Sequence, residues 1–144
     1  MATLLAGDTL VDDYEPLRVL VIDQAEKTHM TRDALAAGGP FFRVEECHSL
    51  RDGIETCRNP WNEVIILATD LPDSWPSDVF LRFSEQASDS PIIIIVESTL
   101  NNLSFERAAR APFCIIDRAK VDPTTIRRLV ASAGILARTL RSLP

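Results

Sequence analysis

The sequence predicts a single α/β domain with a doubly wound, five-stranded parallel sheet, helices on both faces and an extended C-terminal helix. Five short apolar runs alternate along the 144 residues with segments of helical periodicity. Short, nearly continuous apolar runs are typical of strands buried on both faces, and their alternation with helices implies a parallel sheet. Right-handed crossovers make the doubly wound topology the expected one.

The apolar runs are the predicted strands. The fourth, which contains four consecutive isoleucines, has the strongest β propensity. In chain order, the predicted strands cover residues 17–22, 41–47, 64–67, 91–96 and 113–116.

Helical spacing and capping residues place helices between these strands. The first helical segment ends at a Gly-Gly pair, and the last begins with an Asp-Pro pair, which is typical of a helix start. Ser49, Ser77 and Asp122 are the predicted N-caps. The expected helices cover 25–37, the stretch after Ser49, the stretch after Ser77, 103–110, and 123 to about 143.

Charge and composition exclude several classes of protein. The formal net charge of −6 argues against a nucleic-acid surface, which needs clustered positive charge. The longest apolar run, 92–96, is too short to span a bilayer. Residues 1–16 carry acidic side chains and no basic one, so we predict a mobile arm and not a signal peptide. We expect a cytoplasmic protein that binds neither nucleic acid nor membrane.

The cysteines and histidines indicate no catalytic or metal site. Cys47, Cys57 and Cys114 lack metal-ligand spacing, and their apolar settings favour reduced thiols. His29 and His48 have no partner in a recognisable triad pattern. We therefore predict a protein that is not an enzyme and has neither a metal nor a cofactor.

The stretch 63–73, Glu-Val-Ile-Ile-Leu-Ala-Thr-Asp-Leu-Pro-Asp, is the most informative motif of the chain. It resembles the third strand and following loop of response-regulator receiver domains of two-component signalling. In that family an acidic residue and four apolar ones precede the phosphorylated aspartate, and Leu-Pro-Asp follows it. Here Ala68 occupies the acceptor position. The resemblance covers roughly residues 17–131 and implies a flavodoxin-like (CheY-like) topology.

The resemblance also implies a degenerate phosphorylation pocket. Where the family has two adjacent acids that hold Mg²⁺, this chain has Asp23 and Gln24. Val96 stands in place of the Thr or Ser that contacts the phosphoryl group, and Asp117 in place of the Lys that pairs with its oxygens. The methyl group of Ala68 cannot accept phosphate, and one carboxylate with a neutral amide makes a poor Mg²⁺ site. We therefore predict a pseudo-receiver.

The sequence leaves two alternatives open for this pocket. Asp70, two residues after Ala68, would be the acceptor if the loop slipped by two positions. Otherwise the altered pocket would be a small-molecule sensor. Asp23 and Asp117 are expected to face each other across it, either as a solvated acidic rim or neutralised by an arginine such as Arg118.

The last predicted helix carries a heptad pattern of apolar residues. Its first turns are expected to pack on the sheet, and the extension at 132–144 is expected to project. We predict a coiled-coil dimer seam or a linker to an output domain; the alternative is one long helix packed on the core. The seam residues are Ile126, Leu129, Ala133, Leu136, Leu140 and Leu143.

Together these features predict an atypical receiver domain at 17–131 that acts as a phosphorylation-independent protein-interaction and dimerisation module. Its expected partner is a histidine kinase or an output domain of a signalling pathway, or a second copy of the chain.

Overall fold

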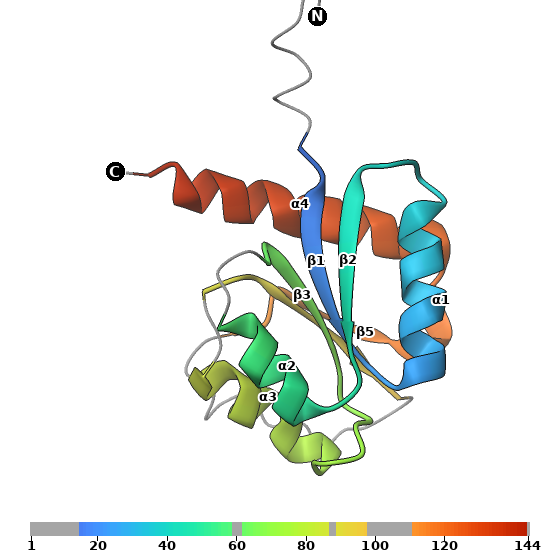
Figure 1. Ribbon diagram of the computed structural model, residues 1–144, viewed down its shortest axis with the longest axis vertical. Helices are drawn as coiled ribbons and strands as arrows, with labels where there is room; N and C mark the ends of the chain where they lie inside the picture. Colours follow the sequence, from blue (N-terminus) through green and yellow to red (C-terminus); the bar gives the residue numbers. More distant parts are fainter. Residues whose placement is uncertain (1–14, 59–61, 87–88, 98–110, 144) are drawn as a thin grey trace, which may run out of the picture.

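The structure, a computed structural model, describes residues 15–58, 62–86, 89–97 and 111–143. It confirms the predicted fold class. Five parallel strands form a sheet in the order β2-β1-β3-β4-β5, with helices on both faces (Figure 1). The strands are β1 (Leu17–Ile22), β2 (Phe42–Cys47), β3 (Val64–Ala68), β4 (Ile92–Val96) and β5 (Cys114–Asp117).

The described helices form two layers. The helices α1 (Ala25–Ala36) and α4 (Pro123–Arg141) cover one face of the sheet, whereas α2 (Leu50–Cys57) and α3 (Pro76–Gln86) cover the other (Figure 1). A short 3₁₀ helix, η2 (Arg118–Lys120), follows β5. None of these helices combines the length and the hydropathy that a membrane crossing requires. The predicted helix at 103–110 and most of the predicted mobile arm lie outside the described residues.

The core lies on both sides of the sheet because successive side chains of a strand point to opposite faces. In β1, Leu20 and Ile22 pack with α2 and α3, whereas Val19 and Val21 pack with α1 and α4. Every residue of β3 and β4 is buried. Burying one large aliphatic side chain contributes about 1.5–3 kcal/mol, so these strands supply much of the stability of the domain.

Two of the three predicted N-caps are confirmed. The side chains of Ser49 and Asp122 each accept a hydrogen bond from the backbone amide three residues further on, at 3.1 and 2.8 Å. The predicted cap at Ser77 is wrong, because α3 begins one residue earlier, at Pro76. Proline suits the first turn of a helix, since its fixed φ is already helical and its missing amide has no partner there.

The first half of α4 packs on the sheet, as predicted. Its buried residues are Ile126, Val130, Ala133 and Gly134. A Cβ atom at Gly134 would lie 2.5 Å from Cδ2 of Leu17, so glycine allows the helix to approach β1 closely. The heptad pattern of apolar residues does not reveal this role.

The second half of α4 is tied to the sheet, so the prediction that it projects is only partly right. Glu63, which directly precedes β3, is buried and accepts hydrogen bonds from Nε of Arg138 at 2.8 Å and Nη2 of Arg141 at 3.1 Å. By contrast, three leucines of the predicted seam are 40%, 53% and 61% exposed; they are Leu136, Leu140 and Leu143.

Candidate functional site

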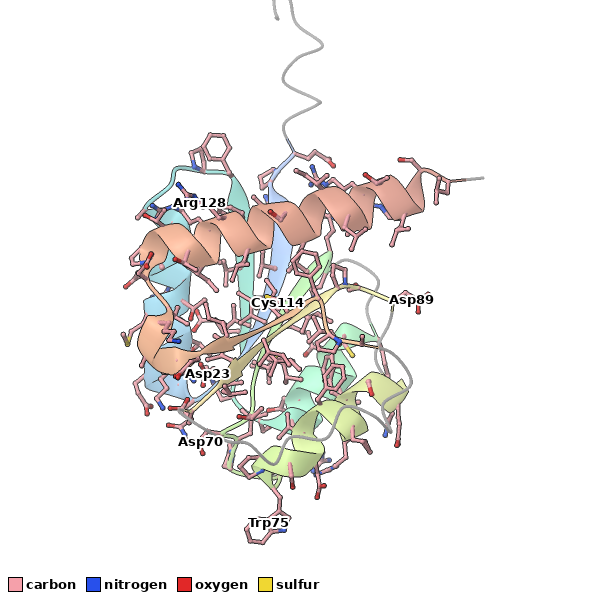
Figure 2. All side chains as sticks on the ribbon, turned by 180° about the vertical axis from the view of Figure 1, so that it is seen from behind. Asp23, Asp70, Trp75, Asp89, Cys114 and Arg128 are labelled. Atoms are coloured by element: carbon pink, nitrogen blue, oxygen red, sulfur yellow. The ribbon has the colours of Figure 1, made fainter. Side chains whose placement is uncertain are left out.

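The carboxyl ends of four strands bring charged side chains together at one edge of the sheet. Asp23 directly follows β1, and Asp70 lies two residues after the end of β3 (Figure 2). Glu97 directly follows β4, and Arg118 directly follows β5. The working groups of open α/β sheets lie at this edge, so these residues mark the candidate site.

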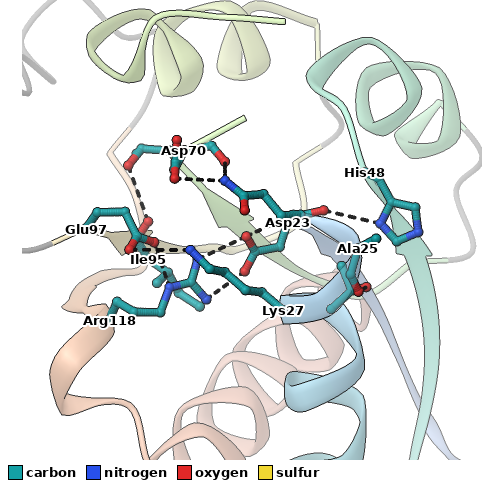
Figure 3. A network of polar contacts seen from close by, with 11 residues as sticks. Asp23, Ala25, Lys27, His48, Asp70, Ile95, Glu97 and Arg118 are labelled. Atoms are coloured by element: carbon teal, nitrogen blue, oxygen red, sulfur yellow. Dashed lines mark hydrogen bonds and ion pairs between the residues drawn. The ribbon is translucent and has the colours of Figure 1, made fainter. Parts of the chain in front are cut away.

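Arg118 neutralises Asp23 (Figure 3). Asp23 is fully buried, and its Oδ2 atom lies 2.7 Å from Nη1 of Arg118. Its Oδ1 atom accepts hydrogen bonds from Nη2 of Arg118 at 3.0 Å and from the backbone amide of Gln24 at 2.8 Å. Arg118 thus makes one charge-assisted hydrogen bond to Oδ1 of Asp23 and a close ion pair with Oδ2, which accepts no hydrogen bond of its own.

Arg118 also binds a second carboxylate. Its Nε atom donates to Oε2 of Glu97 at 2.7 Å, and Nζ of Lys27 lies 3.7 Å from the other oxygen of Glu97. Burial tends to lower the pKa of Arg118, but the hydrogen bonds and charges of Asp23 and Glu97 outweigh it and raise that pKa. Asp23, Arg118, Glu97 and Lys27 thus form a network of two negative and two positive charges.

Gln24 fastens the loop after β3 to this network. Its side-chain Nε2 atom donates to Oδ2 of Asp70 at 2.8 Å and to the backbone oxygen of Asp70 at 3.2 Å. β3 ends at Ala68, so Asp70 belongs to the loop and not to a continued strand. Asp70 is therefore held by an amide of the chain itself.

The expectation that Asp117 faces Asp23 is wrong. The side chain of Asp117 accepts a hydrogen bond from the backbone amide of Ala119 at 3.0 Å and so caps η2. It is the next residue, Arg118, that points into the pocket. The suggested neutralising arginine is correct, and an acidic rim formed by Asp23 and Asp117 is not present.

The remaining predicted pocket positions are apolar and buried. Ala68 is the last residue of β3 and is fully buried, and Val96 ends β4 and is 9% exposed. Neither side chain offers a hydroxyl or carboxylate oxygen to the pocket.

The residues present do not fit the Mg²⁺ ion that the resemblance implies. Mg²⁺ requires several oxygen ligands in near-octahedral geometry. Both oxygens of Asp23 face the guanidinium of Arg118, and Gln24 presents its N–H group to Asp70. Within the described ranges, moreover, no three His, Cys, Asp or Glu side chains cluster in a way that would hold a metal ion.

Comparison with known proteins identifies the fold. A response-regulator receiver domain protein from Clostridium thermocellum has a TM-score of 0.72 at 16% identity, over 86% of this chain and 98% of that one. A CheY-like receiver domain protein from Methanospirillum hungatei has a TM-score of 0.70 at 16% identity, over 88% of this chain and 99% of that one. The chain has the receiver-domain fold. No family model matches the sequence, and neither does any curated protein.

One solved structure with the receiver-domain fold contains a phosphorylated aspartic acid. A response-regulator protein from Burkholderia pseudomallei that contains a phosphorylated aspartic acid has a TM-score of 0.64 at 12% identity, over 88% of this chain and 73% of that one. Within the receiver-domain fold, this chain places Ala68 at the end of β3 and a guanidinium beside its buried acid.

Sequence reasoning recognised part of this network. Asp23, Gln24 and Asp70 were singled out by position, and Arg118 only as a possible neutralising group. Lys27, in the first turn of α1, is not among the predicted site residues, and its partner Glu97 lies far from it in the sequence. Charged residues that directly follow buried parallel strands were the more general signal for this network.

Proposed function

We propose that this protein is a pseudo-receiver, a module with the receiver-domain fold that acts in signal transduction by binding proteins without being phosphorylated. The observation that carries the proposal is the contact between Arg118 and Asp23. A cation-binding carboxylate that is already paired with an internal cation has no need of Mg²⁺, and Ala68 supplies no nucleophile for phosphoryl transfer. The pocket is thus closed by the chain's own side chains.

The loops around the pocket support a fixed conformation. Gln24 holds Asp70, and the carboxylate of Asp73 accepts hydrogen bonds from the first two backbone amides of α2 at 2.8 and 3.0 Å. The loop after β3 is therefore held at Asp70 by Gln24 and at Asp73 by the start of α2. We propose that the protein presents one constitutive binding state to a cytoplasmic partner, such as a histidine kinase or an output domain.

We further propose that the protein forms a homodimer through α4. Leu136, Leu140 and Leu143 recur at helical spacing and are exposed. A second copy of the chain would remove them from water by a two-fold pairing of the helices.

Incubation with acetyl phosphate and Mg²⁺, followed by intact-mass measurement, tests the absence of phosphorylation. The expected result is no mass gain, in the native protein and in Asp70→Asn alike. A gain of one phosphoryl group that Asp70→Asn abolishes would show that Asp70 is an acceptor and would overturn the proposal.

Thermal-shift screening against small metabolites tests the alternative that the altered pocket is a small-molecule sensor, because a ligand of the folded state raises the melting temperature.

A further inference from the structure

The loop between β3 and α3 displays a tryptophan to solvent beside the closed pocket. The indole of Trp75 is 77% exposed, the largest exposure among the large hydrophobic side chains of the described residues. It stands out from the carboxyl edge of the sheet, the edge that carries Asp23 and Asp70 (Figure 2). Tryptophan is enriched among the residues that dominate binding energy at protein interfaces.

The backbone on either side of Trp75 is fixed by hydrogen bonds. Its carbonyl accepts the amide of Asp78 at 2.9 Å, at the start of α3. The carbonyl of Asp73 accepts Nη1 of Arg82 at 3.3 Å, while the carboxylate of Asp73 caps α2. An aromatic side chain on a backbone that is already ordered loses little conformational entropy when it binds.

Trp75 borders a hollow on the surface. This hollow, of about 450 Å³, is lined by Pro72, Asp73, Ser74, Trp75, Asp78 and Arg82. Pro72 also lines a neighbouring hollow of about 270 Å³, to which Gln24, Glu26 and Asp70 contribute. The two hollows flank Pro72 and together offer room for a short extended segment of another protein.

The charge of this surface selects the partner. Four carboxylates line the two hollows, those of Glu26, Asp70, Asp73 and Asp78, against a single guanidinium, that of Arg82. The neighbouring network of Asp23, Arg118, Glu97 and Lys27 is balanced in itself and does not offset this surplus. A cationic side chain that reaches the surface would meet both the negative field and the face of an indole, which attracts cations.

We propose that the surface formed by Pro72, Trp75 and Asp78 docks a segment of a partner protein that carries arginine or lysine side chains. Trp75 stacks on one of these cations, and Asp78, Asp70 and Glu26 pair with the others. The proposal gives a partner chemistry to the interaction module proposed above and in that sense rests on it. It depends neither on the phosphorylation state nor on α4. A failure of peptide binding at Trp75 is therefore distinguishable from a failure of the pseudo-receiver or homodimer proposals.

Titration of the ¹⁵N-labelled protein with a synthetic glycine-serine peptide that carries three arginines is the test. The same peptide with citrulline in place of arginine is the matched neutral control. The expected shifts centre on the Trp75 indole N–H and on the amides of residues 72–78. Trp75→Ala should weaken binding at least about threefold, the loss of a solvent-exposed cation–π contact. Asp78→Asn should also weaken peptide binding. Ile135→Ala, which removes an exposed apolar residue of α4, is the control and should leave binding unchanged.

Salt supplies a second readout, because screening weakens contacts between exposed charges. Binding of the arginine peptide should fall when NaCl is raised from about 50 to about 500 mM. The proposal is overturned if the citrulline peptide binds equally well, or if Trp75→Ala leaves the Kd unchanged. Shifts that centre on another surface of the protein would overturn it as well.

Discussion

Nη1 of Arg118 lies 2.7 Å from Oδ2 of Asp23, and this contact joins two residues that are 95 positions apart in the sequence. It links the end of β5 to the end of β1, two strands that do not neighbour each other in the sheet. The pair lies at the carboxyl edge of the sheet, and the proposed pseudo-receiver function depends on it. Under that proposal, one ion pair would both stabilise the fold and leave no site for Mg²⁺.

Arg118→Ala should destabilise the protein strongly. The change leaves the buried carboxylate of Asp23 without its counter-charge, which costs about 3–5 kcal/mol in comparable cases. Chemical denaturation at neutral pH measures the effect. Arg128→Ala, which removes an exposed arginine of α4, is the control and should have little effect.

Asp117→Asn should also be nearly neutral in the same denaturation experiment, since asparagine caps a helix as well as aspartate does. If Asp117→Asn stabilised the protein, Asp117 and Asp23 would have to repel each other after all.

Glu63 should contribute a pH-dependent part of the stability. Burial raises its pKa, but hydrogen bonds from Arg138 and the Arg18 backbone amide, together with the charges of Arg138 and Arg141, bring the pKa below its ordinary value of 4.5. A lowered pKa in the folded state stabilises the protein above pH 4.5, and this contribution is lost as the pH falls further through the folded-state pKa.

The variant Glu63→Gln isolates that contribution. At pH 7 it should be less stable than the native protein by about 2 kcal/mol, because a charge-assisted interaction is lost. The difference should shrink as the pH falls below about 4.5. Unfolding curves between about pH 3 and pH 7 give the comparison. Glu55→Gln on α2 is the control, because Glu55 is exposed. A difference that stays constant across this range would show that the carboxylate charge is not what ties α4 to the sheet.

Gly134 should act through its contact with Leu17. Gly134→Ala brings a methyl group to about 2.5 Å from a carbon of Leu17, so either the leucine or the helix must shift. Overpacking of this kind costs about 1–3 kcal/mol. In a Leu17→Ala background the clash is gone, and Gly134→Ala should then stabilise the protein by up to about 1 kcal/mol through helix propensity. The same sign in both backgrounds would mean that close packing is not the reason for glycine.

The fold was predictable because each strand can be recognised from its own short apolar run. Runs such as Ile92–Val96 need burial on both faces, and their alternation with helical segments implies a parallel sheet between two helical layers. Predicted N-caps located helix starts less reliably. Ser77 has the side chain of an N-cap, yet Pro76 already fits the first turn, so the helix begins before the expected cap.

The site was predictable in position but not in pairing. Residues that follow the strands could be located from the apolar runs, and the resemblance to receiver domains then pointed to Asp23 and Asp117 among them. Which of two adjacent residues turns into the pocket depends on the backbone after β5, where η2 begins at Arg118 and Asp117 becomes its cap. No periodicity in the sequence encodes that turn, so the sequence did not show that Asp117 caps η2 while Arg118 contacts Asp23.

The exposed leucines of α4 lead to the last prediction, which concerns self-association. Leu136, Leu140 and Leu143 are 40%, 53% and 61% exposed, while Arg138 and Arg141 hold the same turns against Glu63. The helix is thus fixed with its leucines outward. Burying a fully exposed leucine contributes about 1.5–3 kcal/mol, and a second copy that covered these leucines would gain roughly half of that for each. Leu136→Glu combined with Leu140→Glu should give a folded monomer, and Ile135→Glu, on the neighbouring side of the helix, should leave the dimer intact. Sedimentation at micromolar concentration measures the mass, and far-UV circular dichroism checks the fold. A native protein that already sediments as a monomer would refute the seam and leave the leucines to a different partner.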